Sequence, residues 1–180
     1  MLSTGSSSSL FKRSAYGFAV CALAATFAST VSADDHGFTF CANFDGPFSS
    51  DLVPPPTCTS PVGLCTHGLL GGDFPADYDF TFSTLQSSQD PTDPTAFVYT
   101  GHSKVTTKQG VISTNDSGII HIPAEGLAPF VTTAVSATGT GRYVGTTGAF
   151  VASGNLDFST GHAVGSYFAH LCNTRHGCFR

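Results

Sequence analysis

The feature that most constrains the fold of this chain is a two-residue alternation of apolar and polar side chains in short segments separated by turn residues. The segment "DYDFTFSTL" (77–85) places Tyr78, Phe80 and Phe82 on one face and acidic or hydroxyl side chains on the other. About eight such segments occur at spacings of roughly 8 to 12 residues, and apolar residues nowhere recur at helical spacing over three turns. We therefore expect an all-β protein, an eight-stranded antiparallel closed β-barrel.

Turn residues predict how the strands are connected. "KQG" (108–110) and "NDSG" (115–118) predict two tight turns, because Gly and Asn accept positive φ, so "VISTN" and "GIIHIP" are expected as successive hairpin strands. The glycine-rich run 139–148 does not match a dinucleotide fingerprint, since Val144 stands at the third glycine position and no helical pattern follows. These glycines are interpreted as corners of the sheet, and no cofactor is expected.

Two segments are expected to precede the barrel. Lys12 and Arg13 come before an apolar run (15–28) and small residues near Ala33, which predicts a secretory signal peptide over residues 1–33 and an extracellular protein. The run is shorter than the roughly 20 residues that span a bilayer, so no membrane span is expected. Residues 34–64, rich in Pro, Ser and Asp, predict an irregular, extended N-terminal arm pinned by disulfides. Residues 65–180 are then the barrel domain.

The charge balance disfavours nucleic acid as a partner. Removal of residues 1–33 leaves five basic side chains against 12 acidic ones, a net charge of −7. Binding of phosphates requires clustered Lys and Arg, which release counterions from the polyanion. An apolar small molecule is the expected partner, and a homo-oligomer is left open.

The cysteines predict disulfides in an oxidising compartment. Five of the six cysteines follow the leader, which allows two disulfides and one free thiol in any of 15 connectivities. Sequence proximity favours Cys58 with Cys65 and Cys172 with Cys178. The tail also places His170 and His176 beside its two cysteines, a set that can bind zinc. The disulfide is the favoured use, so no metal is expected there.

A family resemblance emerges from the C-terminal half. The run "GTGRYVGTTGAFVASGNLDFSTGHAVGSYFAHLC", preceded by "GVISTNDSGIIHI", resembles the allene-oxide-cyclase-like barrel superfamily, whose plant relatives include the dirigent proteins. The Gly-x-Gly-Arg-aromatic-x-Gly-x-x-Gly turn, the "G-x-L-D" strand and the "TG…G-x-Y" hairpin carry the likeness over roughly residues 65–172. The resemblance implies a barrel with a central cavity that encloses an apolar small molecule and sometimes steers its cyclisation or coupling. It assigns no catalytic residue here.

Face parity predicts which side chains line such a cavity. If the apolar faces point inward, three phenols converge on an otherwise apolar interior, where they could orient a ligand or donate a proton. The alternative is that they are core tyrosines bonded to the backbone. The predicted cavity residues are Tyr78, Phe80, Phe97, Tyr99, Ser103 and Tyr167.

Other catalytic patterns are missing from the sequence. The only glutamate, Glu125, lies in a Pro-Gly loop, and the aspartates are expected mostly in turns or on the outer face, so no opposed carboxylate pair of a glycosidase is predicted. No Gly-x-Ser-x-Gly elbow is present, which disfavours a serine hydrolase. Asn115 begins an N-glycosylation sequon, expected at a hairpin tip.

Two hypotheses for function remain. In the first, the protein is a cofactor-free isomerase, cyclase or stereocontrol protein that holds a reactive apolar molecule in one conformation. In the second, it is a non-catalytic secreted protein that carries a ligand or presents its loops to a host partner. Phenols that point outward would favour the second.

Overall fold

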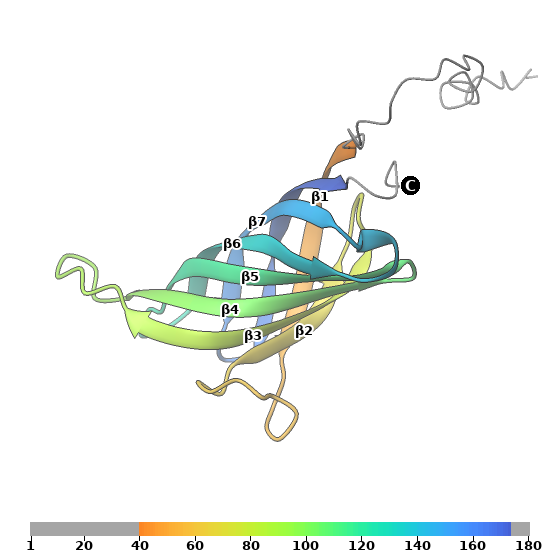
Figure 1. Ribbon diagram of the computed structural model, residues 1–180. Helices are drawn as coiled ribbons and strands as arrows, with labels where there is room; N and C mark the ends of the chain where they lie inside the picture. The colour runs from red at the N-terminus through yellow and green to blue at the C-terminus, as the bar shows by residue number, and fades with distance from the viewer. Residues whose placement is uncertain (1–39, 174–180) are drawn as a thin grey trace, which may run out of the picture. The chain divides into compact units, whose positions relative to one another are not determined.

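Eight antiparallel strands close into a barrel in which each strand pairs with its neighbours in the chain (Figure 1). The computed structural model describes residues 40–173. Strand β8 pairs with β1 from Phe40↔Asn173 to Asp51↔His162, and this ladder closes the barrel. The elements are β1 (Phe40–Leu52), β2 (Cys65–Leu70), β3 (Ala76–Ser87), β4 (Ala96–Thr107), β5 (Gly110–His121), β6 (Leu127–Gly139), the 3-10 turn η1 (Gly141–Tyr143), β7 (Thr146–Asp157) and β8 (His162–Asn173).

The predicted fold class is confirmed. The number of strands is also eight as predicted, but only because one strand was missed and another was predicted as two. Residues 40–52, assigned to the irregular arm, form β1, which pairs with both β2 and β8. The two strands predicted on either side of "NDSG" are one strand, β5. The barrel therefore begins at Phe40 rather than at residue 65. The predicted signal peptide (1–33) and residues 34–39 lie outside the described residues.

Strand β1 forms despite its Pro, Ser and Asp content because its apolar residues alternate. Phe44 and Phe48 point to the interior, whereas Asp45 and Asp51 are exposed. Pro47 has no backbone N–H, but this removes no hydrogen bond between β1 and β8. Its carbonyl accepts from Gly71 N (2.8 Å) just beyond the end of β2, and the nitrogen of an extended residue faces the same side as its carbonyl. Proline is thus placed where no strand needs its missing N–H.

Strand β5 runs straight through the predicted "NDSG" turn. Asn115 pairs with His102 of β4 and with Val135 of β6, in the middle of both ladders. Gly118 serves close packing rather than a turn, because a Cβ there would lie 2.4 Å from Val131 O and 2.5 Å from the Tyr99 ring. Asn115 is exposed on the outer wall of β5 and is not at a hairpin tip. The predicted "KQG" turn does connect β4 to β5.

The glycine-rich run is confirmed as a corner of the sheet. Gly141 and Gly145 have φ of 59° and 78°, conformations that L side chains rarely adopt. Gly141 begins η1 and Gly145 follows it, between β6 and β7. A bulge in β3 between Phe82 and Thr84 shifts the strand by one residue. As a result both Phe82 and Leu85 pack into the interior, which strict alternation would forbid.

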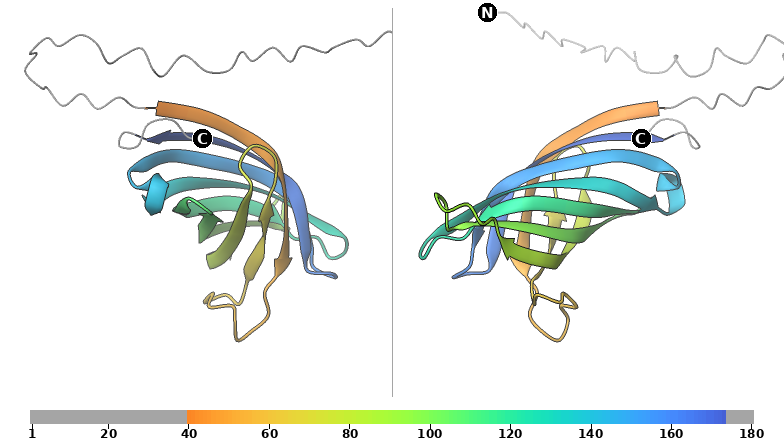
Figure 2. Two further views of the ribbon diagram at one scale, coloured as in Figure 1. Left: turned by 90° about the vertical axis from the view of Figure 1, so that its right-hand side faces the viewer. Right: turned by 60° about the vertical axis from the view of Figure 1, so that its left-hand side comes forward.

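The interior is filled by two aromatic-rich clusters along the barrel axis. One contains Phe48, Phe74, Phe150 and Tyr167, and the other contains Phe80, Phe82 and Tyr99, with Tyr78 and Phe130 packed against both. Loop 53–64 projects beyond one end of the barrel (Figure 2). No described residue belongs to a helix with the length and apolar character needed to cross a membrane.

Two disulfides join the described cysteines. Cys58–Cys65 is the predicted pair and ties loop 53–64 to the start of β2. The second bond is Cys41–Cys172, so the predicted pairing of Cys172 with Cys178 is wrong. The reason is the ladder, because Cys41 of β1 lies directly opposite Cys172 of β8. Cys178 lies outside the described residues. Two disulfides are consistent with an extracellular protein.

Candidate functional site

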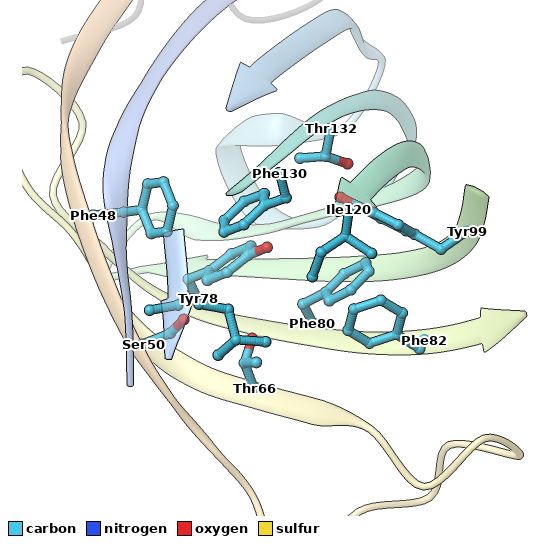
Figure 3. Close-up of a pocket in the computed structure, with 12 residues that line it drawn as sticks. Phe48, Ser50, Thr66, Tyr78, Phe80, Phe82, Tyr99, Ile120, Phe130 and Thr132 are labelled. Atoms are coloured by element: carbon cyan, nitrogen blue, oxygen red, sulfur yellow. The ribbon is translucent and has the colours of Figure 1, made fainter. Parts of the chain in front are cut away.

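Two adjoining hollows lie inside the barrel. Each has a cavity volume of about 40 Å³. Phe48, Tyr78, Phe130 and Thr132 line both, so only side chains separate them. Figure 3 shows the rings of Phe48, Tyr78, Phe80 and Phe130 turned toward one another across the first hollow. Each hollow exceeds the roughly 10–15 Å³ that one water requires but is well below the volume of a drug-sized pocket.

The second hollow contains a buried carboxyl group. Asp116 of β5 is only 4% exposed, and its side chain points into the barrel. Ser103 Oγ of β4 donates to Asp116 Oδ2, and Thr114 Oγ1 donates to Oδ1 at 2.5 Å. Among the described residues that line the two hollows there is no Lys, Arg or His. The carboxyl is therefore held by neutral hydroxyls in an apolar surrounding.

Burial sets the protonation behaviour of this group. Desolvation raises the pKa of Asp116, and the bonds from Ser103 and Thr114 and the charge of His102 on the outer face counteract only part of that rise. The carboxyl thus keeps its proton to higher pH than an exposed aspartate. Once protonated, it can donate a hydrogen bond as well as accept one.

Two phenols lie close to this carboxyl. Tyr78 of β3 lines both hollows, and burial raises its pKa, with the Asp116 charge adding to the effect and a Ser103 hydrogen bond opposing it. Tyr99 of β4 lines the first hollow, and burial raises its pKa to about 12 while a hydrogen bond with Thr132 opposes the shift. Both phenols therefore stay protonated across the physiological range and can act as hydrogen-bond donors.

The third predicted phenol has a structural role. The Tyr167 hydroxyl donates to Gly71 O at 2.7 Å and accepts from Phe74 N at 3.2 Å, so it anchors the connection between β2 and β3. Tyr167 also lines the second hollow. Of the other predicted residues, Phe80 lines the first hollow and Ser103 the second. Phe97 lines neither and packs, partly buried, against the cluster around Tyr99.

Asp116 is the site residue that the sequence reasoning missed. Its position in "NDSG" suggested a turn, and the aspartates were expected mostly in turns or on the outer face. The signal that could have found it is the alternation through this run, because Ile112, Thr114, Asp116 and Ile120 share the inward face of one continuous strand. Only the assumption of a hairpin obscured it.

A surface cleft adjoins the first hollow. The cleft has a volume of about 420 Å³ and lies between loop 53–64 and strands β2 and β3. Thr66 and Phe80 line both the cleft and the hollow, and they are cross-strand partners, so the paired strands β2 and β3 separate the cleft from the interior. His67 and Asp79 are on the cleft side, with His67 Nδ1 2.7 Å from Asp79 Oδ1.

Comparison of the chain with protein-family models, curated proteins and solved structures finds no significant match. The described residues form an eight-stranded closed barrel with buried aromatic clusters and a buried carboxyl group, that of Asp116.

Proposed function

We propose that the barrel encloses a small, mainly apolar molecule that carries one oxygen function, such as a carbonyl, an epoxide or a hydroxyl. The apolar part would lie among the aromatic rings of Phe48, Phe80 and Phe130, and the oxygen would meet Asp116 and Tyr78. The resemblance of the C-terminal half to allene-oxide-cyclase-like barrels supports this class of ligand. The single observation that carries the proposal is Asp116.

A buried carboxyl group in this position lowers the stability of the fold, so its presence favours a functional role. Burial of a polar group in an apolar interior costs free energy that hydroxyl partners offset only in part, and well-packed hydrophobic residues would fill the same space without that cost. The group lies on the wall of a hollow, and its hydrogen bonds to Ser103 and Thr114 include no charged partner. A ligand oxygen would complete its hydrogen bonding.

The chemistry that follows is acid catalysis combined with confinement. A protonated Asp116 can donate to an epoxide or carbonyl oxygen, while the barrel wall holds the flexible chain in one folded shape. Together these effects would make the protein a cofactor-free isomerase, cyclase or stereocontrol protein. Rotation of Phe130, which lines both hollows, would join them into one space.

The small volume of the hollows favours a second candidate, a non-catalytic carrier. At about 40 Å³ each, the hollows hold a ligand only if side chains move, and a protein that merely stores a molecule can tolerate slow exchange of this kind. In this case the ligand would bind without any change in its covalent structure.

Native mass spectrometry of protein purified from its own host tests both candidates. We expect one small molecule retained per chain, and Asp116→Asn should preserve the fold while lowering conversion of a reactive epoxide or polyene by about 100-fold or more. Asp77→Asn, a change on the exposed outer face of β3, is the matched control. Retention of a ligand without conversion by the wild type would support the carrier. Absence of both would contradict the proposal.

A further inference from the structure

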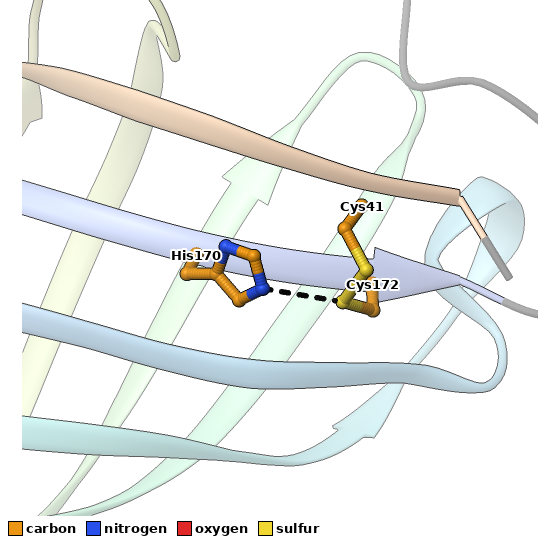
Figure 4. A group of neighbouring side chains, drawn as sticks. All are labelled: Cys41, His170 and Cys172. Carbon is orange, nitrogen blue, oxygen red and sulfur yellow. Dashed lines mark hydrogen bonds between the residues drawn. A yellow bond between two sulfur atoms is a disulfide. The ribbon is translucent and has the colours of Figure 1, made fainter.

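Three potential metal ligands meet on the outer wall of the barrel, remote from the hollows. Cys41 of β1 lies directly opposite Cys172 of β8, and His170 precedes Cys172 by two residues and so shares its face (Figure 4). Both sulfurs and a ring nitrogen of His170 lie within 4.8 Å of one another. Cys41 and His170 are exposed, so an ion can reach them from solvent.

The histidine is already oriented toward the sulfurs. His170 Nδ1 lies 2.7 Å from Asn43 Oδ1, which can only accept a hydrogen bond, so Nδ1 carries the proton. Nε2 therefore presents its lone pair, and it lies 3.5 Å from Cys172 Sγ. Metal-binding histidines commonly donate their other ring N–H to such an oxygen. Asn43 lies opposite His170 in the β1–β8 ladder, so the same strand pair positions all four side chains.

We propose that reduction of the Cys41–Cys172 disulfide converts this cluster into a Zn²⁺ site. Two molecules of a thiol of the glutathione class transfer two electrons and two protons to the S–S bond, which breaks, and they leave as one oxidised disulfide. Zn²⁺ then displaces the two thiol protons and binds both thiolates and neutral His170 Nε2. The oxidised disulfide of the same thiol class can take two electrons back from the two thiolates, which re-forms the Cys41–Cys172 bond and releases the ion, so the site is gated by the redox state.

One distance in the cluster already fits this site, and the two sulfurs must move apart once their bond is broken. Zn–S bonds of about 2.3 Å and Zn–N bonds of 2.0–2.1 Å in a tetrahedron place the ligand atoms roughly 3.5–3.8 Å apart. The present distance between His170 Nε2 and Cys172 Sγ, 3.5 Å, is already in that range. The ladder from Phe40↔Asn173 to Asp51↔His162 holds Cys41 opposite Cys172 after the covalent bond is broken. A water molecule or another donor can take the fourth position.

The other disulfide supplies a control within the same chain. Among the described residues, Cys58 and Cys65 belong to no comparable group of three ligands. Loss of this pair should leave zinc binding intact. All proteins in the test carry Cys21→Ser and Cys178→Ser, so that these two thiols neither bind the ion nor exchange with the disulfides.

Titration of the full-length protein with Zn²⁺, and with Co²⁺ as a spectroscopic probe, tests the proposal after reduction by a phosphine. We expect one ion per chain, thiolate-to-cobalt charge-transfer absorption, and binding at least 100-fold weaker in the oxidised protein. His170→Ala and Asn43→Ala should each weaken binding by at least roughly 10-fold. Cys58→Ser with Cys65→Ser should bind as tightly as the parent.

Circular dichroism of the reduced protein separates metal binding from unfolding. If the reduced barrel stays folded and binds no ion, or if His170→Ala binds as tightly as the parent, the proposal is wrong. If reduction unfolds the chain, Zn²⁺ should restore the β-sheet spectrum in the parent but not in Cys41→Ser with Cys172→Ser. Failure to restore it in the parent would equally overturn the site.

Discussion

At the scale of single residues, Asp116 and Tyr167 illustrate two different uses of a buried polar group. Tyr167 has backbone partners on both sides of its hydroxyl and stabilises a chain connection. Asp116 and Tyr167 both line the second hollow, but the Asp116 carboxyl accepts hydrogen bonds from the side-chain hydroxyls of Ser103 and Thr114. The difference in partners, rather than in burial, separates a structural group from a candidate functional one.

The pH dependence of stability should reveal the Asp116 carboxyl. Its pKa in the folded protein is raised above the usual 3.8, so the folded state holds the proton more tightly than the unfolded state. This contribution is fully present below about pH 4 and is lost as the pH rises through the folded pKa. Thermal unfolding from pH 4 to pH 8 should therefore show a smaller loss of stability in Asp116→Asn than in the wild type. Equal slopes would contradict a raised pKa, and Asp77→Asn should match the wild type.

Removal of the Tyr167 hydroxyl should affect stability rather than ligand binding. Tyr167→Phe takes away the donor to Gly71 O and the acceptor for Phe74 N, at a cost of about 1–3 kcal/mol for buried groups left without a partner. Urea unfolding measures this loss. Tyr78→Phe, which affects a phenol on the wall of both hollows, is the comparison. If Tyr167→Phe abolished ligand retention while stability remained unchanged, the structural assignment would be wrong.

At the scale of elements, β1 and β5 show that pairing with neighbouring strands can make a strand of a segment whose local sequence favours a turn or an irregular structure. The Pro47 nitrogen faces the end of β2, which makes a proline compatible with a strand inside a closed barrel. The "NDSG" run has turn propensity, yet β4 and β6 pair with it on both sides and the interior accommodates Asp116. Propensity is overridden where two ladders and a buried face agree.

Gly118 tests the packing of β5. Its Cβ would lie 2.4 Å from Val131 O and 2.5 Å from the Tyr99 ring, so Gly118→Ala forces the backbone and the ring apart. We expect a loss of about 1–3 kcal/mol in the free energy of unfolding, the usual cost of overpacking. Urea unfolding checks the value. Ser117→Ala, at the adjacent exposed position, should stay within about 0.5 kcal/mol of the wild type. A neutral effect of Gly118→Ala would mean that the Tyr99 ring does not lie over this residue.

At the scale of the whole molecule, the barrel is closed by the pairing of its first and last strands. The Cys41–Cys172 disulfide reinforces this closure across 131 residues of sequence, whereas Cys58–Cys65 closes a loop of only 7. The longer loop restricts the unfolded chain more strongly.

The two disulfides should therefore differ in their effect on stability. Chain-entropy arguments give about 5 kcal/mol for Cys41–Cys172 and about 2 kcal/mol for Cys58–Cys65. Paired Cys→Ser variants, compared by thermal and urea unfolding in the absence of metal ions, measure both losses. The ranking is the prediction, and a larger loss from removal of Cys58–Cys65 would contradict it.

Alternation and turn spacing in the sequence were enough to predict an all-β barrel, and they also predicted the inward face of Tyr78, Phe80, Tyr99 and Ser103. These features are local, because successive side chains of a strand point to opposite faces whatever the partner strand is. The Cys58–Cys65 bond was equally local.

Only the tertiary structure decided the role of β1, the continuity of β5, the Cys41–Cys172 bond and the position of Asp116. Each depends on which residue lies across a ladder or across the barrel, and that pairing joins distant positions such as Cys41 and Cys172, which are 131 residues apart in the sequence. Local periodicity carries information about the face of a strand, but the identity of a cross-strand neighbour is set by register and closure.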